Sequence, residues 1–582
     1  MKKSNIFLGI IIFLVFLIQG ILTLSHYGLN WDETAHYLRG QAYARYFLTG
    51  KTDYTDLPKI RSHYPTNKDA VLPDVKFEDD SFFRRSIYQY DREGEKFTFP
   101  YYIKHDKGHP PLNGILASFS NMLFYQKFGL IGDIESYHLF TIFVSSVLAA
   151  SVFLFVAHFY GKFAAIIATL SLALYPLFFS ESHFNIKDPV EVTFYSLTLF
   201  TFYIGIIKDK WKWIIASGIF AGFALGTKFN IIFTGFTIAL WFVIYYWKSI
   251  KRLSWPFSKS MSISLVLFPF IAFSILYASW PYLWQNPSNI MNTLSYYSEI
   301  GIFSYQPHSY YFFGVNTYAL QWILFTTPLI ILLYCFFGIF YVLKHGVSEK
   351  NKLAIFIFLW LLVPIIRVSF FKTGIYGGLR QIMEFMPAMA ILAGLGAAEI
   401  AKLLSGYIVK RFKQFNNLTI KQFNLVQIGI IVLFIPLVLK LIDIHPHQNV
   451  YFNTLIGGLE GAKNKNFADW GLTLGSSYKE GVDWLNENAE KNAKLSLIRG
   501  LHANIPRTTL RRDIDLDNRY YSGSKKNGEY IIEVTDYRWN IDIAREIRDY
   551  LETLLPVYEV KVDGVAILTI WKNDKKHLKT NY

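Results

Sequence analysis

The sequence predicts an all-α polytopic membrane protein of about 11 transmembrane helices, followed by a C-terminal extracytoplasmic α/β domain. Of the 582 residues, 52% are hydrophobic and only 17% are charged, whereas soluble proteins carry about a quarter charged residues. The chain also contains a series of apolar runs, each long enough to cross about 30 Å of hydrocarbon. Lys and Arg are distributed asymmetrically among the connections between these runs. This composition excludes a disordered chain, a collagen-like fibre and a cytosolic nucleic-acid-binding protein.

The first apolar run covers residues 6–24 and follows Lys2 and Lys3. The residues after it offer no small-residue cleavage site, so we interpret the run as an uncleaved first span and not as a signal peptide. With the two lysines in the cytoplasm, the chain from Ser25 onward begins outside the membrane. Ten further spans are predicted at residues 137–159, 163–180, 189–207, 213–227, 229–247, 261–280, 318–343, 353–369, 382–400 and 424–442.

The positions of the basic residues support this topology. With the N-terminus inside, the cytoplasmic segments carry 18 Lys and Arg residues, and the short outer connections carry five. An excess of this kind is typical of cytoplasmic loops. The net charge of +15 is therefore explained largely by topology, and we expect a lipid bilayer and no nucleic acid among the partners.

The chain is predicted to divide into a membrane domain, residues 1–442, and an extracytoplasmic α/β domain, residues 443–582. The first outer loop covers residues 25–136, and a second, rich in Tyr and Trp, covers residues 281–317. In the tail, hydrophobic periodicity predicts helices over residues 477–488 and 542–554 and strands over residues 530–534, 557–562 and 566–571. The single cysteine, Cys335, has no partner for an intramolecular disulfide.

Ionisable residues gather at the outer ends of the predicted spans, where burying them is costly. The acidic ones are Asp32 and Glu33, after the first span, and Asp188, at the start of the fourth. The basic ones are His109, Lys228, Lys372 and Arg380. We predict Asp32, Glu33 and Asp188 as catalytic residues and the four basic residues as substrate-binding residues.

These residue types suit glycosyl transfer from a polyprenyl-phosphate sugar. A carboxylate can deprotonate an acceptor hydroxyl, and fixed cations, or a divalent metal held by carboxylates, can stabilise a phosphate leaving group. No cofactor is required with certainty, and the metal ligands are not identifiable from the sequence. Each residue also has an ordinary structural explanation: acidic residues cap helices, and Lys and Arg near span ends extend toward water.

The order of these residues resembles that of the GT-C fold glycosyltransferases, specifically the dolichyl-phosphate-mannose protein mannosyltransferases and the bacterial aminoarabinose transferases. The shared motifs are collinear: Trp31-Asp32-Glu33, Gly108-His109-Pro110-Pro111-Leu112, Asp188-Pro189, Gly222-Phe223-Ala224-Leu225-Gly226-Thr227-Lys228 and Tyr376-Gly377-Gly378-Leu379-Arg380. In the tail, Asp469-Trp470-Gly471 and Tyr478-Lys479-Glu480 look like segments of bacterial and archaeal members.

The resemblance implies that Asp32 is the catalytic base, that Asp188 supports the site, and that Lys228 and Arg380 bind the donor phosphate. It also implies that residues 113–128 lie along the membrane interface and do not cross it. The chain departs from the family at His109, where the aminoarabinose transferases usually have Lys.

The predicted function is that of an integral membrane glycosyltransferase in the plasma (inner) membrane, inverting at the anomeric carbon. Its partners would be a polyprenyl-phosphate sugar donor and a glycan, lipid or protein acceptor on the extracytoplasmic side. The alternatives are a transporter or flippase for lipid-linked sugars, which would be expected to show internal repeats, and a structural scaffold of the cell envelope.

Overall fold

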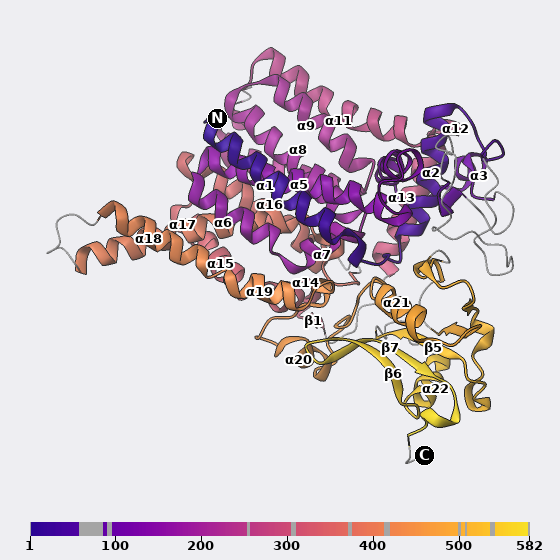
Figure 1. The fold of residues 1–582 in the computed structure, drawn as a ribbon. Helices are drawn as coiled ribbons and strands as arrows, with labels where there is room; N and C mark the ends of the chain where they lie inside the picture. The colour runs from indigo at the N-terminus through magenta and orange to yellow at the C-terminus, as the bar shows by residue number, and fades with distance from the viewer. Residues whose placement is uncertain are drawn as a thin grey trace.

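The computed structural model describes residues 2–57, 85–89, 96–252, 256–303, 310–370, 375–411, 419–498, 502–506, 509–535 and 542–579. Over these residues a body of packed helices is followed by a smaller unit built on a β-sheet. Figure 1 shows this unit at the end of the helical body that lies away from the N-terminus.

The helical body extends from the N-terminus to residue 443. Its helices are α1 (Lys3–Thr23), α2 (Glu33–Thr49), α3 (Phe99–His105), α4 (Leu112–Asn121), α5 (Asp133–Phe159), α6 (Lys162–Ala173), α7 (Pro176–Phe184), α8 (Asp188–Lys208), α9 (Trp211–Leu225), α10 (Thr234–Lys251), α11 (Lys259–Ser279), α12 (Pro281–Gln285), α13 (Asn289–Phe303), α14 (Tyr318–Thr326), α15 (Leu329–His345), α16 (Lys352–Phe370), α17 (Phe385–Arg411), α18 (Thr419–Val432) and α19 (Ile435–Asp443).

Within the described residues, eight helical segments are long and apolar enough to cross a membrane, and the number rises to ten if each of two bent helix pairs is one span. The bent pairs are α6 with α7, at 61°, and α14 with α15, at 118°. Together with the shorter apolar helix α9, these segments correspond one by one to the 11 predicted runs. The prediction of a multi-pass, all-α membrane protein is confirmed.

The two bends are the main departure from the predicted spans at residues 163–180 and 318–343. Each bend has a proline beside it: Pro176 is the first residue of α7, and Pro328 directly precedes α15. Proline has no backbone N–H to donate and clashes with the preceding turn, so a helix usually ends or kinks there.

Helices α2 and α4 are not among the candidate spans, as predicted for residues 113–128. They pack closely because two glycines face each other. A Cβ atom on Gly40 would lie 2.2 Å from the carbonyl oxygen of Gly114, and one on Gly114 would lie 2.6 Å from that of His36. This contact holds the helix that follows Asp32 against the helix that follows His109.

The C-terminal unit contains a five-stranded mixed sheet in the order β4-β3-β5-β7-β6. Its strands are β3 (Lys494–Leu497), β4 (Asp515–Leu516), β5 (Tyr530–Val534), β6 (Pro556–Val562) and β7 (Val565–Lys572). Strand β3 pairs in parallel with β4 and β5, whereas β7 pairs antiparallel with β5 and β6.

The predicted elements of this unit are confirmed. Helix α21 (Tyr478–Asn488) and helix α22 (Asp542–Leu551) are present. The three predicted strands correspond to β5, β6 and β7. The sequence did not predict β3 and β4, which have only four and two residues, too few to show a period.

Candidate active site

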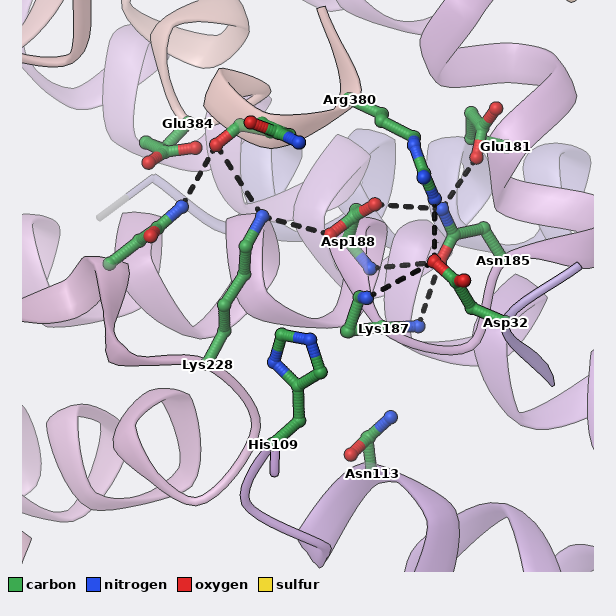
Figure 2. Close-up of polar contacts among 12 residues, drawn as sticks. Asp32, His109, Asn113, Glu181, Asn185, Lys187, Asp188, Lys228, Arg380 and Glu384 are labelled. Carbon is green, nitrogen blue, oxygen red and sulfur yellow. Dashed lines mark hydrogen bonds and ion pairs between the residues drawn. The ribbon is translucent and has the colours of Figure 1, made fainter. Parts of the chain in front are cut away.

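The candidate site is formed by four turns at the ends of helices, brought together from distant parts of the chain. Asp32 directly precedes α2, and Lys187 and Asp188 stand at the start of α8. Lys228 follows α9, and Arg380 opens the short 3₁₀ helix η7 (Arg380–Ile382) before α17. Figure 2 shows these side chains pointing toward one another, with Asp32 paired to Arg380 and Lys187 and with Asp188 paired to Lys228.

Asp32 is held by two cations. Its Oδ2 atom accepts a hydrogen bond from Nη1 of Arg380 at 2.7 Å and lies 3.4 Å from Nζ of Lys187. The side chains of Arg380 and Lys187 are only 12% and 9% exposed, whereas that of Asp32 is 44% exposed. The carboxylate therefore has buried positive charge behind it and an open side through which another molecule can approach.

Asp188 forms the second pair and is fully enclosed. Its Oδ1 atom accepts from Nζ of Lys228 at 2.9 Å, and its side chain is 3% exposed. Nδ2 of Asn185 donates to Oδ2 of Asp188 at 2.9 Å and to Oε2 of Glu181 at 2.6 Å. The Oδ1 atom of Asn185 in turn accepts from the backbone N–H groups of Lys187 and Asp188, so this one side chain sets the shape of the turn that starts α8.

Lys228 also contacts the segment that carries Arg380. Its Nζ lies 3.4 Å from the carbonyl oxygen of Gln381, which also accepts from Nδ2 of Asn230 at 2.9 Å and from Nη2 of Arg367 at 3.0 Å. Three donors thus converge on one backbone oxygen next to Arg380. The ion pairs of Asp32 and the ion pair of Asp188 are therefore fixed relative to each other.

His109 enters the site on a turn that is held by Arg39. The guanidinium of Arg39 donates to the carbonyl oxygens of His109 and Pro110 and forms a 2.7 Å ion pair with Asp106. The ring of His109 is hydrogen-bonded through Nδ1 to the hydroxyl of Tyr297. Figure 2 places its side chain on the same side of the site as Lys187 and Lys228.

Burial and neighbouring charge decide the ionisation of these groups. Burial, reinforced by the charge of Lys187, holds the pKa of His109 well below its usual range, so the ring is neutral near pH 7 and not the cation that the sequence suggests. Burial tends to raise the pKa of Asp32, but Arg380 and Lys187 outweigh it and hold that pKa well below its usual range. Asp32 is therefore ionised.

Glu33 does not join the ion pairs of its neighbour Asp32. Its carboxylate is buried and accepts from the backbone N–H of Asn30 at 2.9 Å and the hydroxyl of Tyr37 at 2.8 Å, and it pairs with Nε2 of His138 at 3.1 Å. These contacts fix the start of α2 against α5. Lys372 lies outside the described residues.

The site contains residues that were not among the predicted ones. Lys187 is one of the five basic residues of the short outer connections and is not a predicted site residue, because Lys near a span end usually extends to water. Asn185 and Glu181 were also not predicted. The sequence signal was the turn Asn185-Ile186-Lys187-Asp188-Pro189, in which a lysine stands beside the predicted acid.

In the described part of the chain, no three His, Cys, Asp or Glu side chains are arranged so that they could hold a metal ion. The carboxylates of Asp32 and Asp188 are instead each paired with Lys or Arg.

A comparison with protein families finds a match to part of the chain. Residues 108–273 match the family described as dolichyl-phosphate-mannose-protein mannosyltransferase. The matched segment contains His109, Lys187, Asp188 and Lys228, and the predicted resemblance to membrane glycosyltransferases is confirmed. No curated protein sequence matches the chain.

Solved structures of low sequence identity are also similar. ArnT from Cupriavidus metallidurans bound to undecaprenyl phosphate has 14% identity and a TM-score of 0.48, and the match covers 100% of both chains. The apo form of the same enzyme has 15% identity and a TM-score of 0.46, with 98% of this chain and 99% of that chain covered. The archaeal oligosaccharyltransferase AglB from Archaeoglobus fulgidus, in complex with an inhibitory peptide and a dolichol-phosphate, has 11% identity and a TM-score of 0.44. This match covers 100% of this chain and 76% of that chain.

Proposed function

We propose that the protein transfers a sugar from a polyprenyl-phosphate donor to an acceptor hydroxyl on the extracytoplasmic side of the membrane, with inversion at the anomeric carbon. The main support for this proposal is the carboxylate of Asp32, which is partly exposed and is held by the buried cations Lys187 and Arg380. The Lys228–Asp188 ion pair lies beside it. The family match over residues 108–273 supports a donor in which a lipid phosphate carries the sugar.

Asp32 is the proposed general base. It is ionised, and its open side leaves room for an acceptor hydroxyl. As the hydroxyl oxygen attacks the anomeric carbon, its proton passes to Asp32, and the bond from that carbon to the phosphate oxygen breaks. Attack from the face opposite the leaving group inverts the configuration.

The charge balance of the site suits a phosphate leaving group. Lys187, Lys228 and Arg380 carry three positive charges, and Asp32 and Asp188 carry two negative charges. This set therefore has one net positive charge before substrate binds, and a phosphodiester adds the compensating negative charge. Preorganised cations of this kind stabilise charge that develops as the phosphate departs.

The position of the site suits a lipid donor. Candidate spans end or begin at His26, Asp188, Phe229 and Phe385, close in sequence to Asp32, Lys187, Lys228 and Arg380. A phosphate attached to a polyprenyl chain within the bilayer would lie at this level. The excess of basic residues on the opposite connections supports a cytoplasmic N-terminus and an extracytoplasmic site.

We further propose that residues 1–442 form the catalytic membrane domain and residues 443–582 an extracytoplasmic domain. Within the catalytic domain, Lys228 and Arg380 bind the donor phosphate and Asp188 supports them. His109 is a neutral hydrogen-bonding group. Glu33 is assigned to the support of α2 on the basis of its buried contacts.

The pH dependence of transfer tests the state of Asp32. Between pH 7 and about 5 we expect a constant rate, because an ordinary aspartate begins to protonate only below about pH 5 and the pKa of Asp32 lies lower. A carboxyl with a depressed pKa remains a proton acceptor until the pH falls to that pKa. Replacement Arg380→Gln removes an attracting charge, so the loss of rate on the acid side should begin at higher pH. An acid limb at the same pH in both proteins would contradict the assignment.

The lipid composition of cells lacking the protein tests the donor class. We expect mass analysis of their lipid extract to reveal an accumulated polyprenyl-phosphate monosaccharide, which disappears when the wild-type gene is restored. Unchanged polyprenyl-phosphate sugars would contradict a donor of this class. Accumulation that is relieved equally well by the Asp32→Asn variant would indicate transport without chemistry at Asp32.

A further inference from the structure

A short segment of the C-terminal region, residues 469–476, contacts both of the turns that carry the Asp32–Arg380 ion pair. We call this segment the strap. It precedes α21 and packs against Tyr27 and Trp31, which follow α1, and against Tyr318 at the start of α14. The two sets of contacts lie at opposite ends of the strap, one at Asp469 and the other at Leu474 and Gly475.

At its first end the strap holds the loop that leads to Arg380. The Oδ2 atom of Asp469 accepts a hydrogen bond from the backbone N–H of Gly377 at 3.0 Å and from the hydroxyl of Tyr318. The same hydroxyl accepts from the backbone N–H of Gly378 at 3.0 Å. Gly377 and Gly378 have φ values of +73° and +68°, a conformation favoured by glycine, and Arg380 follows two residues later.

At its other end the strap holds the turn that carries Asp32. The backbone N–H of Trp31 donates to the carbonyl oxygen of Leu474 at 2.9 Å. Gly475 lies so close to the indole of Trp31 that a Cβ atom would come within 2.3 Å of Nε1. The residue directly before Asp32 is therefore fixed by backbone and by side chain.

The backbone of the strap is itself strained at these two ends. Asp469 has a φ of +67° and Leu474 a φ of +58°. Leucine rarely adopts this left-handed conformation, which persists only where the surrounding structure demands it. The strain thus coincides with the two points at which the strap meets the active-site turns.

We propose that the strap sets the geometry of the Asp32–Arg380 pair, with Asp469 and Tyr318 as positioning residues for sugar transfer. This inference rests on the proposed function and deepens it, because it gives the C-terminal region a part in the reaction. Asp469 and Tyr318 act through Arg380, and the strap keeps the base and the phosphate-binding cation at a fixed separation.

A double-mutant cycle tests the inference. Tyr318→Phe keeps the buried ring and removes only the hydroxyl that links Asp469 to Gly378. With a labelled polyprenyl-phosphate sugar as donor, we expect kcat to fall about tenfold, since small misplacements of catalytic groups are costly, while the KM for the donor stays within about twofold of the wild-type value. In an Arg380→Lys background, the same replacement should cause no further fall, because coupled residues are not additive.

The matched control is Tyr310→Phe. The hydroxyl of Tyr310 accepts from the backbone N–H of Ala468 at 2.8 Å, beside the strap, and its ring packs against that of Tyr318. Like Tyr318→Phe, this replacement removes one phenol hydroxyl, but the hydroxyl is the one bonded to Ala468, outside the strap. We therefore expect kcat near that of the wild type. Asp469→Asn, which keeps an acceptor oxygen, should retain more activity than Asp469→Ala.

Three outcomes for the tyrosine variants would each overturn the inference: a kcat within twofold of the wild type for Tyr318→Phe, an equal fall for Tyr310→Phe, or additive falls in the Arg380→Lys background. The melting temperature of each variant is measured alongside, and equal losses of kcat and melting temperature in Asp469→Asn and Asp469→Ala would also overturn it. Failure of the proposed function is recognised separately, because the wild-type protein would then transfer no sugar from the polyprenyl-phosphate donor.

Discussion

Replacement of Asp32 by Asn is expected to lower the rate of sugar transfer by about 10²- to 10⁴-fold, the range that general acid–base catalysis contributes. The amide has the shape of the carboxylate and still offers an oxygen to Arg380, but it cannot accept the proton of the acceptor hydroxyl. The rate is measured in membranes from cells lacking the native protein, with a labelled polyprenyl-phosphate sugar and the endogenous acceptor.

Asp56 offers a matched control for this replacement. It lies in the same outer loop, its side chain is 39% exposed, and it is paired with two cations, Arg45 and Lys51. Asp56→Asn therefore removes the same charge from a similar environment away from the site, and we expect it to leave the rate within about twofold of the wild type. Equal rates for Asp32→Asn and wild type would remove Asp32 from the mechanism.

Replacement of Lys228 by Met is expected to abolish measurable transfer and to destabilise the protein by about 3–5 kcal/mol, because it leaves the buried carboxylate of Asp188 without a partner charge. The side chains of both residues are less than a tenth exposed. Thermal unfolding of the purified protein in detergent gives the stability, and the membrane assay gives the rate.

The double variant Lys228→Met with Asp188→Asn separates stability from chemistry. The neutral amide no longer needs a cation and can still interact with Asn185, so most of the lost stability should return. Transfer should not return, because the positive charge for the departing phosphate is still missing. Recovery of transfer together with stability would show that Lys228 serves only to neutralise Asp188.

The sequence was sufficient to predict that ionisable residues at the ends of the spans lie together. Asp32, Asp188, Lys228 and Arg380 could be found because ionisable residues are costly at the ends of spans, and the structure places all four together. Their pairing could not be predicted. The choice of Arg380 and Lys187 as partners of Asp32, 348 and 155 residues away, depends on how the helices pack.

The separation of Asp32 from Glu33 shows a second limit. Adjacent carboxylates look equivalent in a sequence, but the start of α2 turns Glu33 toward Tyr37 and His138 and leaves Asp32 facing Arg380. The strap is a third example. Asp469 belongs to a motif that the sequence analysis identified in the tail. Its contact with Gly377, however, forms only when the C-terminal unit packs on the helical body.

Consumption of a polyprenyl-phosphate sugar by the purified protein is the most direct test of the central claim. The wild-type protein is reconstituted in lipid vesicles with an extract containing the acceptor, and polyprenyl-phosphate sugars and nucleotide sugars are offered in turn. We expect release of free polyprenyl phosphate with transfer of the sugar in the inverted configuration, and no reaction with nucleotide sugars. Transfer from a nucleotide sugar, with every polyprenyl-phosphate sugar left intact, would contradict the proposed function.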